Sequence, residues 1–127
     1  MALEFLGLMI ILLLMVGILL TLFAVNMAIE VAVAFVLGLR TRYGIAAVAL
    51  VNLLTYPILM LLLVIGPAFD IQFGKSPLIF LLEGLIVVVE WRLLAYALGK
   101  SGKRILAITF AMNLISFLPG CILSLLL

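Results

Sequence analysis

A run of 35 residues, Phe5–Leu39, contains a single charged side chain, that of Glu30. As one helix this run would measure about 52 Å, whereas the hydrocarbon core of a bilayer is about 30 Å thick. No turn-forming residues interrupt it at 18–23, which favours one long helix over two short spans. Glu4 stands where a signal peptide has its positive segment, so we expect an uncleaved first helix. The first helix is therefore predicted to be longer than a bilayer requires.

The composition predicts a membrane protein along the whole chain. Hydrophobic residues make up 70% of the 127 residues and charged residues only 9%, while a water-soluble domain carries about 25% charged residues. The length suits a single domain, 1–127, of about four helical spans of roughly 20 residues each. A net charge of +2 gives no basis for binding nucleic acid. We therefore expect an all-α integral membrane four-helix bundle whose surroundings are the lipid bilayer.

The turn signals place the four helices. After the first helix we expect a second from about Tyr43 to Ile65, ended by Gly66 and Pro67. A third helix should begin with Ser76 as N-cap and Pro77 in the first turn, as helix starts prefer, and should end at Leu98. A fourth should run from Ile105 to the end of the sequence. The main polar loop is then 67–77.

Charged residues in the turns predict the orientation. The loop between the second and third helices carries Asp70 and Lys75, whose charges cancel. The turns after the first and third helices hold the basic residues Arg40, Arg42, Lys100, Lys103 and Arg104. The positive-inside rule places both basic turns in the cytoplasm. We therefore expect a multi-pass protein of the cell (inner) membrane with both termini outside.

Six features occur twice in the same order: an acid, a basic turn, an Asn, a hydroxyl, an aromatic and a Pro. The first copy consists of Glu30, Arg40, Asn52, Thr55, Tyr56 and Pro57, and the second of Glu90, Lys100, Asn113, Ser116, Phe117 and Pro119. The acid and the Asn are 22 residues apart in the first copy and 23 in the second. We interpret this as a duplicated two-helix unit, with repeat 1 at about 21–66, repeat 2 at about 77–127 and an N-terminal overhang at 1–20. Because the first and third helices run in the same direction, this is a parallel repeat with its axis along the membrane normal.

Each predicted helix carries one polar residue at the same depth. Counted from the basic turns, these four residues lie about 13 to 15 Å from the cytoplasmic boundary, near the midplane. A charge there costs roughly 2.5 kcal/mol or more, so they should face inward and find partners. Other polar side chains lie on the same helix faces. The candidate residues for an ion, proton or substrate site are Glu30, Glu90, Asn52, Asn113, Asn26, Glu83, Arg92, Thr55 and Ser116.

Three interpretations of this polar layer are open. In the first, Asn, Thr and Ser side chains join the helices, and Arg92 neutralises one glutamate unless it extends to the cytoplasmic surface instead. In the second, Glu30 and Glu90 carry a proton or a cation, with Asn carbonyl oxygens as further ligands. In the third, the glutamates serve an intramembrane enzyme. The lack of His argues against an enzyme, Cys121 has the sequence context of a small hydrophobic residue, and we expect no cofactor.

The pattern also resembles a family. Glu30, Asn52-Leu-Leu-Thr-Tyr-Pro57, Glu83, Glu90 and Asn113-Leu-Ile-Ser-Phe117 are similar to a group of small prokaryotic four-helix membrane proteins. In that group the first motif usually reads Asn-x-x-Thr-Asn-Pro, and here Tyr56 stands at the second Asn. The resemblance runs from about Thr21 onward and implies a multi-pass membrane protein without a particular activity. A cation site that depends on the missing Asn is disfavoured in this chain.

Two features of the first helix predict partners. Residues 3–18 are almost wholly apolar and extend beyond the span that the bilayer needs, so they should bend back into the outer leaflet or dock on another subunit. Ala24, Ala28 and Ala32 form a stripe of small residues about 160° away from Glu30, which predicts neighbours on both sides of the helix. We expect a transport-type or cation- or proton-binding component that works in an oligomer or a larger complex. The alternative is a structural or assembly subunit without an activity of its own.

Overall fold

The computed structural model describes residues 2–69, 77–100 and 102–126, and this part of the chain is helical without strands. The elements are α1 (Ala2–Val36), α2 (Arg42–Ile65), the 3-10 turn η1 (Gly66–Phe69), α3 (Leu78–Leu98) and α4 (Lys103–Leu126). The predicted all-α class with four helices is confirmed. Residues 70–76, which hold most of the predicted polar loop, lie outside the described residues.

The first helix is uninterrupted but ends earlier than its apolar run predicts, at Val36 instead of Leu39. Gly38 adopts a φ of 107°, which is unfavourable for residues with a side chain. The N–H of Gly38 donates to the carbonyl of Phe35 at 3.2 Å, and the N–H of Leu39 donates to the carbonyl of Ala34 at 2.9 Å. This pair of bonds is the Schellman motif that closes helices at a left-handed glycine. Hydropathy gave no sign of this stop, because the residues on either side of the glycine are apolar.

The third helix ends in the same way, at the predicted Leu98. Gly99 has a φ of 60°, and the N–H of Lys100 donates to the carbonyl of Ala95 at 3.1 Å. At its start, however, Pro77 occupies the N-cap position, where we had expected Ser76. Proline has a fixed φ that suits a helix start, and Ser76 itself lies outside the described residues.

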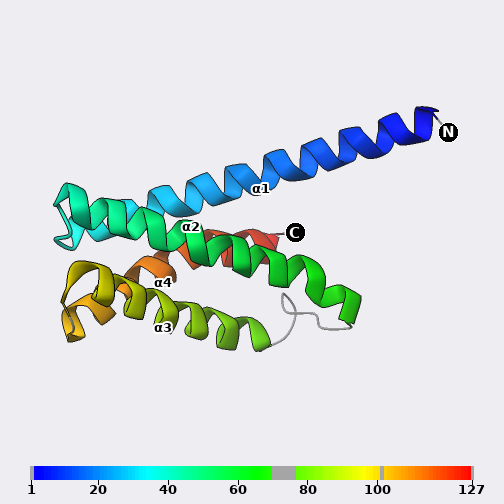
Figure 1. Cartoon of the computed structure of the whole chain (residues 1–127). Helices are drawn as coiled ribbons and strands as arrows, with labels where there is room; N and C mark the ends of the chain where they lie inside the picture. The colour runs from blue at the N-terminus through cyan, green and yellow to red at the C-terminus, as the bar shows by residue number, and fades with distance from the viewer. Residues whose placement is uncertain (1, 70–76, 101, 127) are drawn as a thin grey trace.

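The four helices form a ring in the order of the chain (Figure 1). α1 packs against α2 and α4, and α3 packs against the same two helices. The turns α1–α2 and α3–α4 lie together at one end, which we call the basic end. The hydroxyl of Tyr43 donates to the carbonyl of Ala97 there at 2.6 Å. The guanidinium of Arg104 lies so close to Gly38 that a Cβ at this glycine would stand 2.6 Å from it. These contacts join the two turns across the bundle.

Two apolar clusters hold the ring together. The basic-end cluster fills the bundle between the turns and the level of Glu30 and Glu90, and its buried members are Ala34, Ala47, Val48, Val51, Leu94, Ile105, Ile108 and Met112. A smaller far-end cluster joins α2 to α3 through Leu59, Leu82 and Ile86. The predicted alanine stripe is in neither cluster. Ala24, Ala28 and Ala32 are all exposed, because α2 and α4 both pack on the opposite face of α1. Within the described chain, α1 therefore has no neighbour on its alanine face, and a partner subunit on that face stays a prediction.

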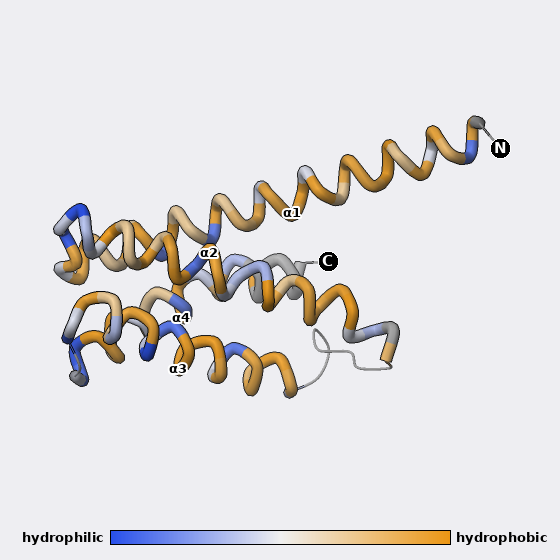
Figure 2. Tube along the Cα trace, viewed as in Figure 1, coloured by the Kyte–Doolittle hydropathy of each residue, from blue (hydrophilic) through white to orange (hydrophobic). Residues whose placement is uncertain are grey.

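Two of the described helices, Leu3–Val36 and Arg42–Ile65, are long and apolar enough to cross a membrane. The α3 helix is also apolar for most of its length but carries Glu83, Glu90 and Arg92. Figure 2 shows the polar residues concentrated at the basic end and at the middle of the bundle, with apolar segments between. This distribution suits a protein whose outer surface meets lipid.

The N-terminal half of α1 extends away from the other helices (Figure 1). Large apolar side chains in this segment are exposed on every side, as shown by Leu8, Ile11, Leu13 and Leu14. None of residues 3–15 belongs to either apolar cluster. The helix does not bend back toward the bundle. The segment predicted to form the overhang is thus a straight continuation of α1, and we call it the α1 overhang.

Candidate functional site

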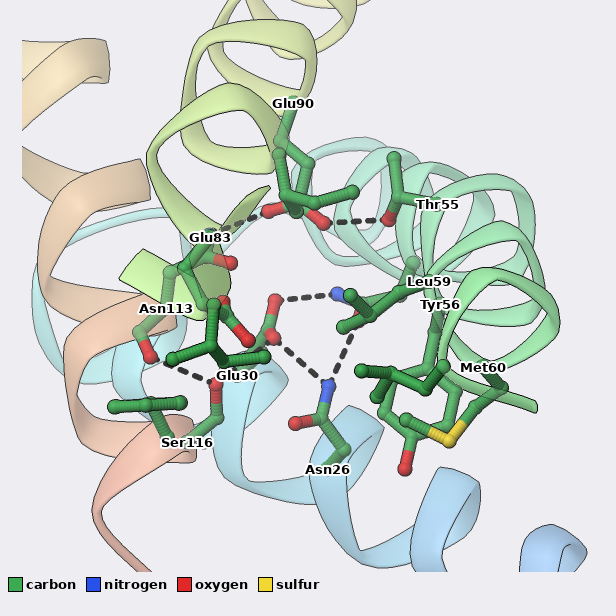
Figure 3. Close-up of a pocket in the computed structure, with 15 residues that line it drawn as sticks. Asn26, Glu30, Thr55, Tyr56, Leu59, Met60, Glu83, Glu90, Asn113 and Ser116 are labelled. Carbon is green, nitrogen blue, oxygen red and sulfur yellow. Dashed lines mark hydrogen bonds between the residues drawn. The ribbon is translucent and has the colours of Figure 1, made fainter. Parts of the chain in front are cut away.

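Glu30 is the centre of a hydrogen-bond network in the middle of the bundle (Figure 3). Its side chain is only 2% exposed. The carboxylate accepts from the side-chain amide of Asn52 at 2.6 Å, from that of Asn26 at 2.9 Å and from the hydroxyl of Ser116 at 3.1 Å. Asn26 lies one turn before Glu30 on the same face of α1, and the other two donors come from α2 and α4. The three donors supply the polar partners that a buried carboxyl group requires.

Glu90 on α3 is buried to the same extent, 2% exposed. Its carboxylate accepts from the hydroxyl of Thr55 on α2 and from the side-chain amide of Asn113 on α4, each at 2.5 Å. The single hydroxyl proton of Thr55 has a second acceptor within reach, the carbonyl of Val51 at 3.0 Å, so the hydroxyl lies between its own helix and α3. Hydrogen bonds to an ionised group are among the stronger ones in proteins. Glu90 therefore joins three helices.

The partners of the two glutamates correspond. Each carboxylate accepts from an Asn on the next helix of the chain: Asn52 for Glu30 and Asn113 for Glu90. Each also accepts from a hydroxyl on the helix pair that does not contain it: Ser116 for Glu30 and Thr55 for Glu90. Both Asn side chains are oriented in the same way, since each amide also donates to the backbone carbonyl four residues earlier in its own helix.

The hydrogen-bond partners of the two glutamates differ at one position, the residue one helical turn before each of them. Asn26 donates to Glu30 and, at 3.3 Å, to the side-chain oxygen of Asn52. Ile86 lies one turn before Glu90 and belongs instead to the far-end cluster. Glu30 therefore has three side-chain donors and Glu90 has two among the described residues.

A cavity of about 210 Å³ lies against this network and extends toward the end of the bundle away from the basic turns. Its polar lining consists of Asn26, Glu30, Asn52, Thr55, Tyr56, Glu83, Glu90, Asn113 and Ser116. The apolar lining, Leu59, Met60, Leu63, Ile79, Ile86 and Phe117, comes from the far side of the polar layer. On the other side of the polar layer lies the basic-end cluster, in which Val48 and Leu94 are fully buried. The cavity thus reaches the two carboxylates from the side away from the basic end.

No cation neutralises these carboxylates in the described part of the chain. The guanidinium of Arg92 lies over the ring of Trp91, 4.7 Å from its centroid, and the residue is exposed on the outside of α3. The expectation that Arg92 neutralises Glu30 or Glu90 is therefore wrong, because its position on the helix points it away from the bundle. Glu83 lines the cavity and makes no hydrogen bond within the described residues. Among those residues, no group of three or more His, Cys, Asp or Glu side chains is arranged to hold a metal ion.

Eight of the nine candidate residues line the cavity, all except Arg92. Sequence reasoning missed the two aromatic residues of the lining, Tyr56 and Phe117. The signal was present, since each follows its Asn by four residues and so lies on the same helix face. Figure 3 shows Tyr56 beside Met60 at one side of the polar layer.

Comparisons with known protein families, with curated proteins and with solved structures find no match to this chain. The function must accordingly be argued from the geometry of the polar layer and its cavity.

Proposed function

We propose that this chain is a multi-pass membrane protein of the transport type, in which Glu30 and Glu90 bind and release protons. One observation carries the proposal. Both carboxyl groups are 2% exposed, accept hydrogen bonds from uncharged side chains alone among the residues that the structure describes, and line the same cavity. Buried ionisable groups at membrane depth are costly and usually serve an ion or proton pathway.

A proton suits this site better than a metal ion. The side-chain amides of Asn52 and Asn113 present their N–H groups to the carboxylates, so the neighbouring ligands are donors. A metal ion needs several oxygen atoms directed at one point. A proton needs only one carboxylate oxygen and neighbours that can still form hydrogen bonds after it binds. The hydroxyls of Thr55 and Ser116 meet this need, because a hydroxyl can donate to the carboxylate and accept from the protonated carboxyl group.

The corresponding contacts support a duplicated unit of two helices. We propose that α1–α2 and α3–α4 are the two units and that all four helices span the membrane. The hydroxyl bonds from Thr55 to Glu90 and from Ser116 to Glu30 then cross between the units. Transporters built from repeats give access to a central site from each side in turn, by moving one repeat against the other. Among the described residues, these two bonds join the two units through side chains at the level of the site.

Infrared spectroscopy of the protein in lipid tests the proton site. We expect part of the carboxyl C=O signal to change with pH and to disappear in Glu30→Gln or Glu90→Gln, because the amide keeps the shape but carries no titratable proton. Glu4→Gln, far from the cavity on the α1 overhang, is the matched control and should leave that signal unchanged. A pH-dependent carboxyl signal as large in the double variant Glu30→Gln/Glu90→Gln as in the wild type would overturn the proposal.

The orientation is tested by labelling with a membrane-impermeant maleimide in a Cys121→Ala background. We expect a cysteine at Phe69, in η1, to react from outside the cell, and one at Gly102, in the second basic turn, to react only after the membrane is opened. The reason is the excess of Lys and Arg in the basic turns. Labelling of the two positions in the reverse order would show that the charge rule gives the wrong orientation.

A second candidate function is assembly within a membrane complex. The observation that favours it is the α1 overhang, where large apolar side chains of residues 3–15 are exposed and belong to neither apolar cluster. Exposed apolar surface of this extent is typical of an interaction site or of a segment within lipid. In this alternative the polar layer only fixes how the four helices pack.

A further inference from the structure

We propose that the cavity beside Glu83 binds a small organic cation with an apolar body, for example an alkylammonium ion. The inference rests on the proposed function, because it names the ligand class of the same cavity. It is carried by three features together: the unneutralised carboxylates, the aromatic and aliphatic walls, and the size of the space.

The charge of the cavity selects for cations. Glu30, Glu83 and Glu90 all line it, and no Lys or Arg forms an ion pair with them in the described part of the chain. Glu30 and Glu90 lie at the closed end with their hydrogen bonds made, whereas Glu83 is half-buried on the side toward the opening. Seven residues separate Glu83 from Glu90, which places it about 10 Å further along α3. A ligand entering the cavity therefore meets the carboxylate of Glu83 first.

The walls select for an apolar body. Tyr56 on α2 and Phe117 on α4 contribute aromatic rings to the lining, and Leu59, Met60 and Leu63 contribute aliphatic surface. The rings have support from their neighbours, since Tyr56 lies 5.3 Å from Phe23 and Phe117 lies 6.1 Å from Phe80 between ring centroids. Aromatic faces attract quaternary ammonium groups, which are weakly hydrated and carry their charge over several carbon atoms.

Other ligand classes fit less well. An anion would be repelled by the carboxylates, and a sugar would leave hydroxyl groups unpaired against the aliphatic wall. A bare metal ion would lack converging ligands. A volume of about 210 Å³ accommodates a compact ammonium ion with a few carbon atoms. Specificity for such an ion over its uncharged analogue would come from Glu83.

Isothermal titration calorimetry on the full chain in lipid nanodiscs tests the site with two probes of equal shape. Choline carries a quaternary ammonium, and 3,3-dimethylbutan-1-ol replaces its nitrogen by carbon and has no charge. We expect choline to bind at least about tenfold more tightly than the alcohol, and Glu83→Gln to remove most of that difference. Glu4→Gln is the matched control and should keep it. Equal affinity for the two probes, or choline binding unaffected by Glu83→Gln, would overturn the inference.

A second variant keeps the test independent of folding. Phe117→Leu removes a ring while retaining an apolar side chain, and we expect it to weaken choline more than the alcohol, because only the cation interacts with the ring electrostatically. Circular dichroism shows whether each variant keeps its helices. Choline binding that fails while the pH-dependent infrared signal of Glu30 and Glu90 persists would reject the organic cation and leave the proton site standing. If the wild-type protein shows no pH-dependent carboxyl signal in the infrared spectrum, the proposed function itself is rejected.

Discussion

Replacing Asn113 by leucine is expected to lower the free energy of unfolding of the bundle by about 3 kcal/mol, because it leaves the buried carboxyl group of Glu90 with a single donor. The change removes the bond from Asn113 to Glu90 and also the bond from its amide to the carbonyl of Thr109. Thr55 then remains as the described partner of a side chain that is 2% exposed. Removing one member of a buried polar network costs more than the bond itself contributed.

The corresponding change in the first half of the chain provides the control. Asn52→Leu is expected to cost only about 1 kcal/mol, since Glu30 keeps the donors Asn26 and Ser116. Unfolding both variants reversibly in mixed micelles measures the difference. The double variant Asn113→Leu/Glu90→Leu should recover part of the stability, because no polar group is then left unpaired. If Asn113→Leu and Asn52→Leu lower the free energy of unfolding equally, the additional donor Asn26 does not protect Glu30 from the loss of Asn52.

Deleting residues 2–15 is expected to leave the bundle intact and to change what the protein associates with. None of the deleted residues belongs to either apolar cluster of the bundle. The remaining part of α1 keeps 21 residues, which is about the length that one span requires. Helix content per residue and unfolding free energy should therefore stay close to those of the full chain.

The assembly state should respond strongly to the same deletion if the overhang docks on another subunit. We expect the full chain to migrate in mild detergent as a larger species and the shortened chain to lose that species. Substituting Leu8 and Ile11 by serine within the full-length overhang is the matched control, because it lowers the apolar surface without shortening the helix. A shortened protein that inserts, assembles and migrates like the full chain would show that the overhang has no protein partner and meets only lipid.

The local sequence was sufficient to predict much of the fold. Helix content, the overhang and the end of α3 at Leu98 follow from apolar runs and turn residues, and these depend on neighbours a few positions apart. The position of Gly38 as the end of α1 was missed, since a glycine between apolar residues gives no hydropathy signal. The gathering of Glu30, Asn52, Glu90 and Asn113 at one level was predicted from their equal distance to the basic turns, because an α-helix has a fixed rise per residue.

The tertiary structure alone decided which groups meet. Helix periodicity places Thr55 and Ser116 on polar faces, but only the packing of α2 against α3 and of α1 against α4 directs them to the glutamate of the other pair. The same packing turns Arg92 outward and leaves one side of the polar layer open while the basic-end cluster closes the other. Rotation of a helix about its axis is set by the volumes of side chains on its neighbours, and these come from distant parts of the sequence. For that reason helix rise and periodicity were enough to predict eight of the nine candidate residues of the cavity lining, whereas the packing of the helices set their partners and turned Arg92 outward.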